Sequence, residues 1–280
     1  MSRLMILLVL TGLAACGVPT QTQAPDSRRP MRIVSLDYCA DQYVLKLADR
    51  DQILALSPEA ARDYSYMHDA AAGLPTIRPV TEDVLLLKPD LVVRAYGGGP
   101  DAEVFFKRAG IPVLTVGWTT SIDGDDAGSI PSIIRQMADG LGQSERGSEL
   151  VSEFHNRLNA ISKRTGGKTA LYMTPAGVTS GPGSMIHEML VSAGFENFEQ
   201  EPGWRSLPLE RLAYGQPDVI AAAFFDQSGP APDSWSPMKH PVAERQMQDQ
   251  PVIQLQGAWT SCSAWFMIDA IEALAEGSDS

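Results

Sequence analysis

Residues 82–93 read Glu-Asp-Val-Leu-Leu-Leu-Lys-Pro-Asp-Leu-Val-Val, and residues 210–221 read Glu-Arg-Leu-Ala-Tyr-Gly-Gln-Pro-Asp-Val-Ile-Ala. The second stretch begins 128 positions after the first and repeats its order: a Glu opens a short apolar segment, Pro-Asp follows seven residues later, and an apolar run comes next. The repeat indicates two lobes of similar build, which present Glu82 and Glu210 at equivalent places. It predicts a bilobed binding protein that docks on a two-fold symmetric partner.

Both copies predict a short helix followed by a buried strand. A Glu in the first helical turn faces the positive end of the helix dipole, and Pro89 and Pro217 stop each helix because proline cannot continue one. The runs 91–93 and 219–223 lack polar alternation, as strands covered on both faces of a parallel sheet do. The alternative is an ordinary helix-to-strand connection in which the Glu only stabilises the start of the helix. It accounts for either copy alone, but less well for two copies with the same spacing.

The rest of the chain alternates between expected strands and helices, which is typical of parallel sheets with crossover helices. The strands expected outside the repeat are at 32–36, 53–56, 113–116, 169–174 and 252–255. The helices expected outside the repeat are at 40–48, 101–109, 129–141, 144–164, 185–193 and 264–275. The sequence predicts an α/β protein with two Rossmann-like lobes, residues 31–122 and 168–280. Connecting helices at 123–167 include one long backbone helix.

The N-terminus has the pattern of an export signal. Arg3 precedes an apolar run at 4–10 that is too short for a permanent membrane span, and Leu-Ala-Ala-Cys at 13–16 resembles a bacterial lipobox. We expect residues 1–15 to be a signal peptide, Cys16 to carry a lipid, and residues 16–30 to form a flexible tether. Ordinary cleavage with an incidental Cys16 is the alternative. The expected location is the periplasm, with membrane attachment only through the lipid.

Two cysteines remain once Cys16 is set aside. Cys39 and Cys262 lie near opposite ends of the mature chain, in a protein whose expected compartment is oxidising. A disulfide and two separate buried thiols are both compatible with the sequence. If the two residues belong to different lobes, a bridge would lock the lobes together and oppose hinge motion, so this argument favours free thiols.

Composition and motifs argue against several classes of function. The formal net charge of −12 disfavours nucleic acid and anionic membrane surfaces as partners. No Gly-x-Ser-x-Gly elbow occurs, and the glycine run at 97–99 lacks a nucleotide-binding pattern, so we expect a tight turn there. We expect no metal site, because four residues show no metal-ligand spacing: His68, His155, His187 and His240. No nucleophile–base pair is visible, so we expect no catalytic residue, and we expect no resident cofactor.

Aromatic side chains stand in loops, mostly where predicted strands end. In a parallel α/β lobe, loops at the carboxyl ends of strands line the ligand crevice, and aromatic rings offer a large apolar contact area with little conformational entropy to lose. A loop anchor packed on the core is the alternative for any single ring, whereas six rings at similar places favour a cleft for a broad, partly apolar ligand. The predicted ligand-binding residues are Tyr64, Tyr66, Tyr96, Trp118, Trp204 and Trp259.

Four stretches in this order resemble the periplasmic substrate-binding proteins of ABC importers for metal chelates. They are Arg-Ile-Val-Ser-Leu at 32–36, the first motif copy, Ala-Gly-Ile-Pro-Val at 109–113, and Trp204 followed by the second motif copy. The resemblance covers roughly residues 31–275 and is closest in layout to the cobalamin-binding members. The family takes up ferric siderophores, haem and cobalamin. The resemblance therefore implies two lobes, a single long helix across the back and only small hinge motion.

The resemblance also implies partners and roles. The expected protein captures a chelate, either a corrinoid such as cobalamin or a ferric siderophore, and delivers it to a dimeric ABC permease. Glu82 and Glu210 match two glutamates that meet arginines on the permease subunits, and Trp204 matches a tryptophan that packs on cobalamin. We expect the receptor to be a monomer.

Departures from the pattern leave the ligand open. The cobalamin binder has a tryptophan where this chain reads Ala95-Tyr96, and Cys39 and Cys262 stand at helix starts that should face the cleft. Few arginines are expected in cleft loops, whereas a trianionic catecholate complex would need a tight arginine cluster. A corrinoid or a less anionic iron chelate is therefore favoured. The alternatives are an exported α/β enzyme and a non-transporting surface lipoprotein.

Overall fold

The structure, a computed structural model, describes residues 29–161, 167–224 and 236–277. The expected signal peptide, Cys16 and nearly all of the tether lie outside these residues. Within them, no helix has the length and apolar character needed to cross a membrane.

The N-terminal lobe is a parallel four-stranded sheet with helices on both faces. Its strand order is β2-β1-β3-β4. The strands are β1 (Ile33–Ser35), β2 (Ile53–Ala55), β3 (Leu91–Arg94) and β4 (Val113–Thr115). The helices are α1 (Tyr38–Leu47), the 3-10 helix η1 (Arg50–Gln52), α2 (Thr81–Leu86) and α3 (Ala102–Arg108). This arrangement confirms the predicted α/β class.

The C-terminal lobe repeats this build. Its main sheet is parallel, in the order β10-β9-β5-β7, and an antiparallel pair of short strands, β6 and β8, lies beside it. The strands are β5 (Thr169–Met173), β6 (Val178–Ser180), β7 (Glu196–Asn197), β8 (Trp204–Ser206), β9 (Val219–Phe224) and β10 (Val252–Gln256). The helices are α6 (Met185–Ser192), α7 (Leu209–Tyr214), η2 (Pro237–Lys239), α8 (Pro241–Asp249), α9 (Gly257–Thr260) and α10 (Met267–Gly277). The β6–β8 pair and α8 are not predicted from the sequence.

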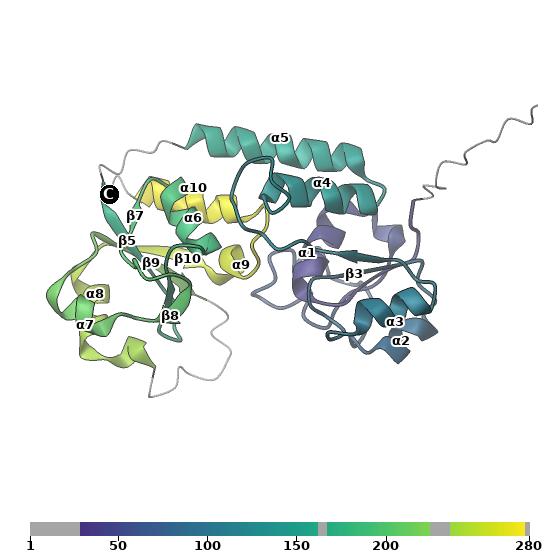
Figure 1. The fold of residues 1–280 in the computed structure, drawn as a ribbon, viewed down its shortest axis with the longest axis horizontal. Coiled ribbons are helices and arrows are strands. Elements are labelled where there is room, and N and C mark those ends of the chain that lie inside the picture. The colour runs from purple at the N-terminus through teal and green to yellow at the C-terminus, as the bar shows by residue number, and fades with distance from the viewer. Residues whose placement is uncertain (1–28, 162–166, 225–235, 278–280) are drawn as a thin grey trace, which may run out of the picture.

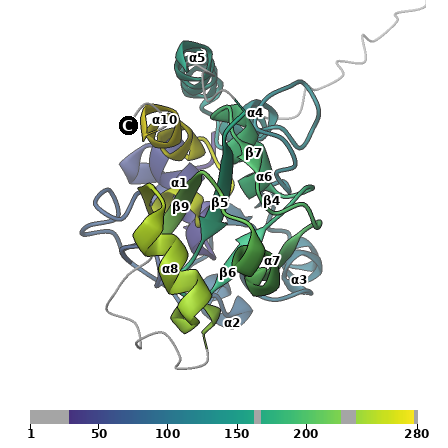
Figure 2. The ribbon, with the colours of Figure 1, turned by 90° about the vertical axis from the view of Figure 1, so that its left-hand side faces the viewer.

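Two helices connect the lobes, α4 (Ile130–Gly140) and the longer α5 (Ser144–Ala160). They pack on each other along one side of the molecule, and α5 passes over the junction of the lobes (Figure 1). Viewed from the end, α5 and α2 stand at opposite sides of the protein (Figure 2). The long connecting helix is therefore present, although its predicted last residues, 162–164, lie outside the described part.

The Pro-Asp pair of each motif copy has a structural role. The Asp90 carboxylate accepts hydrogen bonds from the backbone N–H groups of Met31 and Arg32, both at 2.9 Å, just before β1. The Asp218 carboxylate accepts from the backbone N–H of Thr169 at 2.7 Å, at the start of β5. Each aspartate thus fixes the start of the first strand of its lobe. This contact within the lobe accounts for the Pro-Asp part of the repeat, and no partner protein is needed to explain it.

One continuous core crosses the junction of the lobes. Its buried side chains include Tyr43 from α1, Phe154 from α5 and Ile271 from α10. The rings of Tyr43 and Trp265, which belong to different lobes, lie 5.1 Å apart between centroids. Packing at crystal-like density makes such a junction stiff.

Cys39 and Cys262 form a disulfide, so the expectation of free thiols is wrong. The bridge joins residues 223 positions apart, with their Cα atoms 5.7 Å from each other. A bridge between the lobes would oppose hinge motion only if the lobes moved as separate bodies. They share a core at the point where the bridge forms, so the bridge links two groups that packing already holds in place.

Candidate functional site

A cavity of about 430 Å³ lies between the lobes. This volume falls within the range of ordinary small-molecule sites. The N-terminal lobe contributes the start of α1, the loop after β3 and the loop after β4, and the C-terminal lobe contributes residues around β8, α6 and the segment 260–264. Most of these segments follow the carboxyl ends of parallel strands, where ligands bind in α/β sheets.

The walls of the cavity are aromatic, aliphatic and weakly polar. Its aromatic lining residues are Tyr38, Tyr43, Tyr96, Trp118 and Trp204, and its hydroxyl-bearing ones are Thr119, Thr120, Ser184, Thr260, Ser261 and Ser263. None of the described residues that line the cavity carries a charge. Arginines 62, 78, 94 and 205 are absent from this lining. The described surface therefore offers ring faces and neutral hydrogen-bonding groups.

Three of the six predicted aromatic residues line the cavity. Tyr96 is 54% exposed, Trp118 86% and Trp204 60%, and they come from both lobes. These large rings are in contact with water in the free protein, and a ligand in the cavity would bury them. They therefore suit the recognition of a broad apolar face.

The other three predicted residues do not line it. Tyr64 stands behind Tyr38, at 5.2 Å between ring centroids. Tyr66 stacks on Phe266 at 4.4 Å and donates a hydrogen bond to Asp269 at 2.7 Å, so it joins the lobes. Trp259 is half-buried against the shared core. Each of these three rings packs against other side chains of the protein.

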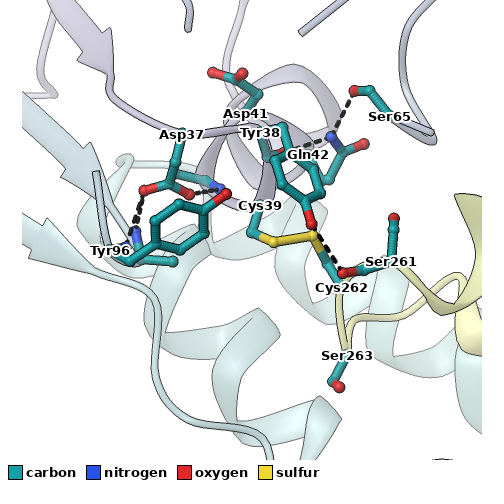
Figure 3. The surroundings of a disulfide bond; sticks show 12 residues. Asp37, Tyr38, Cys39, Asp41, Gln42, Ser65, Tyr96, Ser261, Cys262 and Ser263 are labelled. Atoms are coloured by element: carbon teal, nitrogen blue, oxygen red, sulfur yellow. Dashed lines mark hydrogen bonds between the residues drawn. A yellow bond between two sulfur atoms is a disulfide. The ribbon is translucent and has the colours of Figure 1, made fainter. Parts of the chain in front are cut away.

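Both cysteines of the disulfide are among the residues that line the cavity. Figure 3 shows the bridge and its neighbours. Beside it, the Tyr38 hydroxyl donates to the carbonyl oxygen of Ser261 at 3.2 Å, and the Thr119 hydroxyl donates to that of Ser263 at 2.6 Å. The segment that carries Cys262 is thus tied to the N-terminal lobe by a covalent bond and two hydrogen bonds. The two halves of the cavity are held in a fixed relation at this point.

Asp37 holds the loop that carries Tyr96. One carboxylate oxygen of Asp37 caps α1 by accepting from the Ala40 N–H at 3.0 Å. The other accepts from three consecutive N–H groups, those of residue 95 at 2.7 Å, Tyr96 at 3.0 Å and Gly97 at 2.8 Å (Figure 3). The close approach needs glycine, because a Cβ at Gly97 would lie 2.3 Å from the Leu36 carbonyl oxygen.

Arg94 holds the same loop from its carbonyl side. This buried guanidinium donates to the carbonyl oxygens of Tyr96 at 3.0 Å and Gly99 at 2.9 Å. Two buried groups of opposite charge therefore fix the turn at 95–99. The glycine run is a tight turn, as the sequence predicts, and these contacts fix the backbone that carries Tyr96.

The tyrosines of this wall are neutral at ordinary pH. Burial raises the pKa of Tyr96, and the nearby Tyr38 hydroxyl and Asp37 carboxylate raise it further. Burial is also the largest cause of the raised pKa of Tyr38, with Tyr64 next. Both phenols therefore act as neutral hydrogen-bonding groups in the free protein.

Asp41 gives the protein a pH-dependent stability. It is fully buried one turn into α1, where its carboxylate accepts from the Ser57 hydroxyl at 2.6 Å and the Ser57 N–H at 3.2 Å. Burial raises the pKa of Asp41 to about 6, against the hydrogen bonds from Ser57 that lower it. The folded state thus holds a proton more tightly than the unfolded state. The resulting stabilisation is complete below the unfolded pKa, near 4, and is lost as pH rises to about 6.

We expect Asp41→Asn, which mimics the protonated acid, to remove this dependence. Between pH 4 and 7 the free energy of unfolding of the wild type should fall by about 3 kcal/mol more than that of the variant, since one unit of pKa corresponds to about 1.4 kcal/mol. Urea unfolding at a series of pH values measures both profiles. Parallel profiles would contradict the assignment.

Glu82 and Glu210 lie outside the cavity, in the first turns of α2 and α7, and both are exposed. Among the described residues, neither glutamate has a cationic partner; Glu82 accepts only from the neighbouring Thr81 hydroxyl, at 3.1 Å. Their two helices stand on the same side of the molecule, opposite α5 (Figures 1 and 2). The described residues contain no group of three or more His, Cys, Asp or Glu placed to hold a metal ion.

The sequence profile of the periplasmic binding protein family matches residues 33–234. The chain belongs to this family. A curated relative, the vitamin B12-binding protein of Salmonella typhimurium, is 28% identical over 151 residues, which cover 51% of this chain and 54% of that protein. The chain thus spans about half the length of the curated relatives it matches.

Solved structures of the family share the fold. The apo periplasmic heme-binding protein of Roseiflexus sp. RS-1 is 19% identical with a TM-score of 0.67, over 88% of this chain and 98% of that one. The periplasmic vitamin B12-binding protein of Vibrio cholerae is 19% identical with a TM-score of 0.64, over 90% and 97%. The predicted family and the predicted bilobed fold are confirmed.

Several residues that line or support the cavity are missed from the sequence. Tyr38 follows β1 by three residues, so the rule that selected Tyr96 and Trp118 would have selected it too. Asp37 reads as an ordinary helix cap, and its contacts with the β3 loop depend on strand order. The hydroxyl groups of 260–263 carry no signal, because short polar loops are common.

Proposed function

We propose that this protein is the substrate-binding component of an ABC importer and carries a metal chelate of low charge, a corrinoid or a ferric siderophore without catecholate groups. The observation that carries the proposal is a cavity between two lobes with three exposed aromatic rings and an uncharged described lining. A trianionic or dicarboxylate ligand would need cationic partners there. A macrocycle with neutral amide edges meets ring faces and hydroxyl groups instead. The relatives named for vitamin B12 support the corrinoid class.

The same lining argues against the enzyme alternative. Ser184, Ser261 and Ser263 are the serines at the cavity, and none of the described lining residues is a His, Lys, Asp or Glu that could act as their base. A serine without a neighbouring base is a weak nucleophile at neutral pH. The described residues of the cavity thus supply contacts for a ligand and no nucleophile–base pair.

Fluorescence titration tests the ligand. We expect cyanocobalamin to quench the intrinsic tryptophan fluorescence of the purified mature protein in a saturable way, after correction for inner-filter absorption. Haem and a ferric catecholate should bind at least ten-fold more weakly, a difference of about 1.4 kcal/mol. If a ferric hydroxamate bound most tightly, the ligand would be a siderophore without catecholate groups, which is the other member of the proposed class. Tight binding of the catecholate, or no response to any chelate, would contradict it.

Trp204→Ala should weaken binding of the tightest chelate by about ten-fold or more, because an aromatic anchor in a binding site contributes more than 1 kcal/mol. Trp259→Phe is the matched control, since that ring lies outside the cavity lining. We expect unchanged affinity for the control. Equal losses for both variants would remove Trp204 from the site.

We further propose that Glu82 and Glu210 dock the loaded protein on the permease. The substitution Glu82→Ala/Glu210→Ala should abolish uptake of the chelate by cells while its affinity in the fluorescence titration stays the same. One exposed ion pair contributes only about 0.2–1 kcal/mol, but the two glutamates would form ion pairs with the same partner at once. A lowered ligand affinity in the double variant would contradict the docking role.

A further inference from the structure

Each of the repeated helices exposes a large apolar side chain one turn after its glutamate. Leu86 follows Glu82 on α2 and is 81% exposed; Tyr214 follows Glu210 on α7 and is 95% exposed. Residues four apart on a helix are neighbours on one face. The inward positions of the same helices, Val84 and Leu212, are buried in their own lobes. Leu86 and Tyr214 therefore take no part in holding the helices on the protein.

Their exposure is the largest among the big apolar side chains of the described residues, apart from Trp118 at the cavity. A single exposed leucine or tyrosine needs no explanation. Here the two occupy equivalent positions of an internal repeat, each beside an exposed glutamate. The repeat keeps the pair of a carboxylate and an apolar side chain, although the apolar residue itself differs.

The two helices that carry these pairs lie on the same side of the protein. In two perpendicular views, α2 and α7 lie away from α5, at the ends of the two lobes (Figures 1 and 2). A partner with two equal sites could contact both pairs at once. A two-fold symmetric protein presents the same site twice, which matches the repeated pair of a carboxylate and an apolar side chain.

We infer that Leu86 and Tyr214 are the apolar anchors of two equivalent contacts with a two-fold symmetric, membrane-embedded protein. In each contact a cation of the partner meets the glutamate and an apolar pocket receives the residue one turn later. The inference rests on the proposed transport function and adds the part of the interface that is not electrostatic.

The chemistry explains why charge alone would not suffice. Exposed ion pairs are weak and are screened at the ionic strength outside the cell. Aromatic and aliphatic anchors that fill pockets carry most of the affinity in typical interfaces. The glutamates set the register, and the anchors supply contacts that salt does not screen.

Photo-crosslinking in the native cell tests the partner. The full-length protein carries p-benzoylphenylalanine at position 86, at position 214 or, as a control, at position 191, where Val191 is a partly exposed residue of α6. We expect positions 86 and 214 to crosslink to one membrane-embedded polypeptide. Mass spectrometry should find the same segment of that polypeptide in both adducts, because a two-fold partner presents one site twice. Position 191 should give no such adduct.

Different segments, a soluble partner or no adduct from 86 and 214 would overturn the inference. The fluorescence titration on the same variants separates this failure from that of the proposed function. Saturable chelate binding without the shared adduct rejects the anchors and keeps the cargo, whereas the shared adduct without any chelate binding rejects the cargo and keeps the anchors.

A second measurement needs no photoreactive residue. Leu86→Ser/Tyr214→Ser should slow uptake of the bound chelate by at least about ten-fold, which corresponds to 1.4 kcal/mol of lost docking. The quench titration and the melting curve should match those of the wild type, because both side chains are exposed. Val191→Ser should leave uptake unchanged. Wild-type uptake by the double variant would overturn the inference.

Discussion

Removal of the disulfide by Cys39→Ser/Cys262→Ser should lower the free energy of unfolding by about 4 kcal/mol. The bridge closes a loop between residues 223 positions apart, so it restricts the unfolded chain strongly. The chain-entropy relation gives a value of about 5 kcal/mol for a loop of this length, and measured effects fall somewhat below it. Serine fills nearly the same space, so the folded state loses little packing.

Denaturant unfolding of the variant and of the wild type, with and without reductant, measures this effect. The reduced wild type should match the double variant, and reductant should leave the variant unchanged, which controls for effects on the rest of the protein. Equal midpoints for the oxidised wild type and the variant would contradict the stabilising role. They would mean that the bridge gives no net stabilisation.

The variant should also bind the chelate more weakly. Cys39 and Cys262 line the cavity, and the segment 260–264 is attached to the N-terminal lobe beside them. Without the bridge, this wall depends on the hydrogen bonds of Tyr38 and Thr119 to the backbone of 261–263. A less ordered wall costs entropy when a ligand binds. The loss of affinity should therefore be small compared with the loss of stability.

The internal repeat carries most of what the sequence reveals about the fold. Its two helices and its two buried strands are where the sequence predicts them, because proline stops and apolar runs are local signals. The β6–β8 pair escapes prediction, since three-residue strands in a glycine-rich region have no period to detect. The disulfide escapes because the relation of the lobes depends on a core built from residues far apart in the chain.

The site is predictable to the extent that it follows strand ends. Tyr96 and Trp118 come to one cavity by that rule, whereas Trp204, which lines the same cavity, is the first residue of β8. Tyr66 fails the rule, because the loop after β2 runs to the junction of the lobes, where Phe266 and Asp269 hold the ring. Loop length and local aromatic content cannot distinguish a ring that faces a ligand from one that closes a core.

Asp37→Asn should cost about 3 kcal/mol of stability and should weaken chelate binding through Tyr96. The wild-type carboxylate accepts from four backbone N–H groups, one in α1 and three in the loop 95–97. An asparagine has one acceptor oxygen, so its amide group must face either the helix N–H or the loop N–H groups. At least one buried donor is then unpaired, which costs about 1–3 kcal/mol, and the charge-assisted bonds to the others weaken.

Coupling between Asp37 and Tyr96 distinguishes positioning from general destabilisation. If Asp37 acts by placing the tyrosine, Asp37→Asn should lower affinity in the wild type and have little further effect in a Tyr96→Ala background. Asp41→Asn is the matched control, because it replaces a buried acid of the same helix that makes none of the loop contacts. It should leave affinity unchanged. Additive losses from Asp37→Asn and Tyr96→Ala would show that the loop binds the ligand by another route, since a residue that only orders Tyr96 has nothing left to order once the ring is gone.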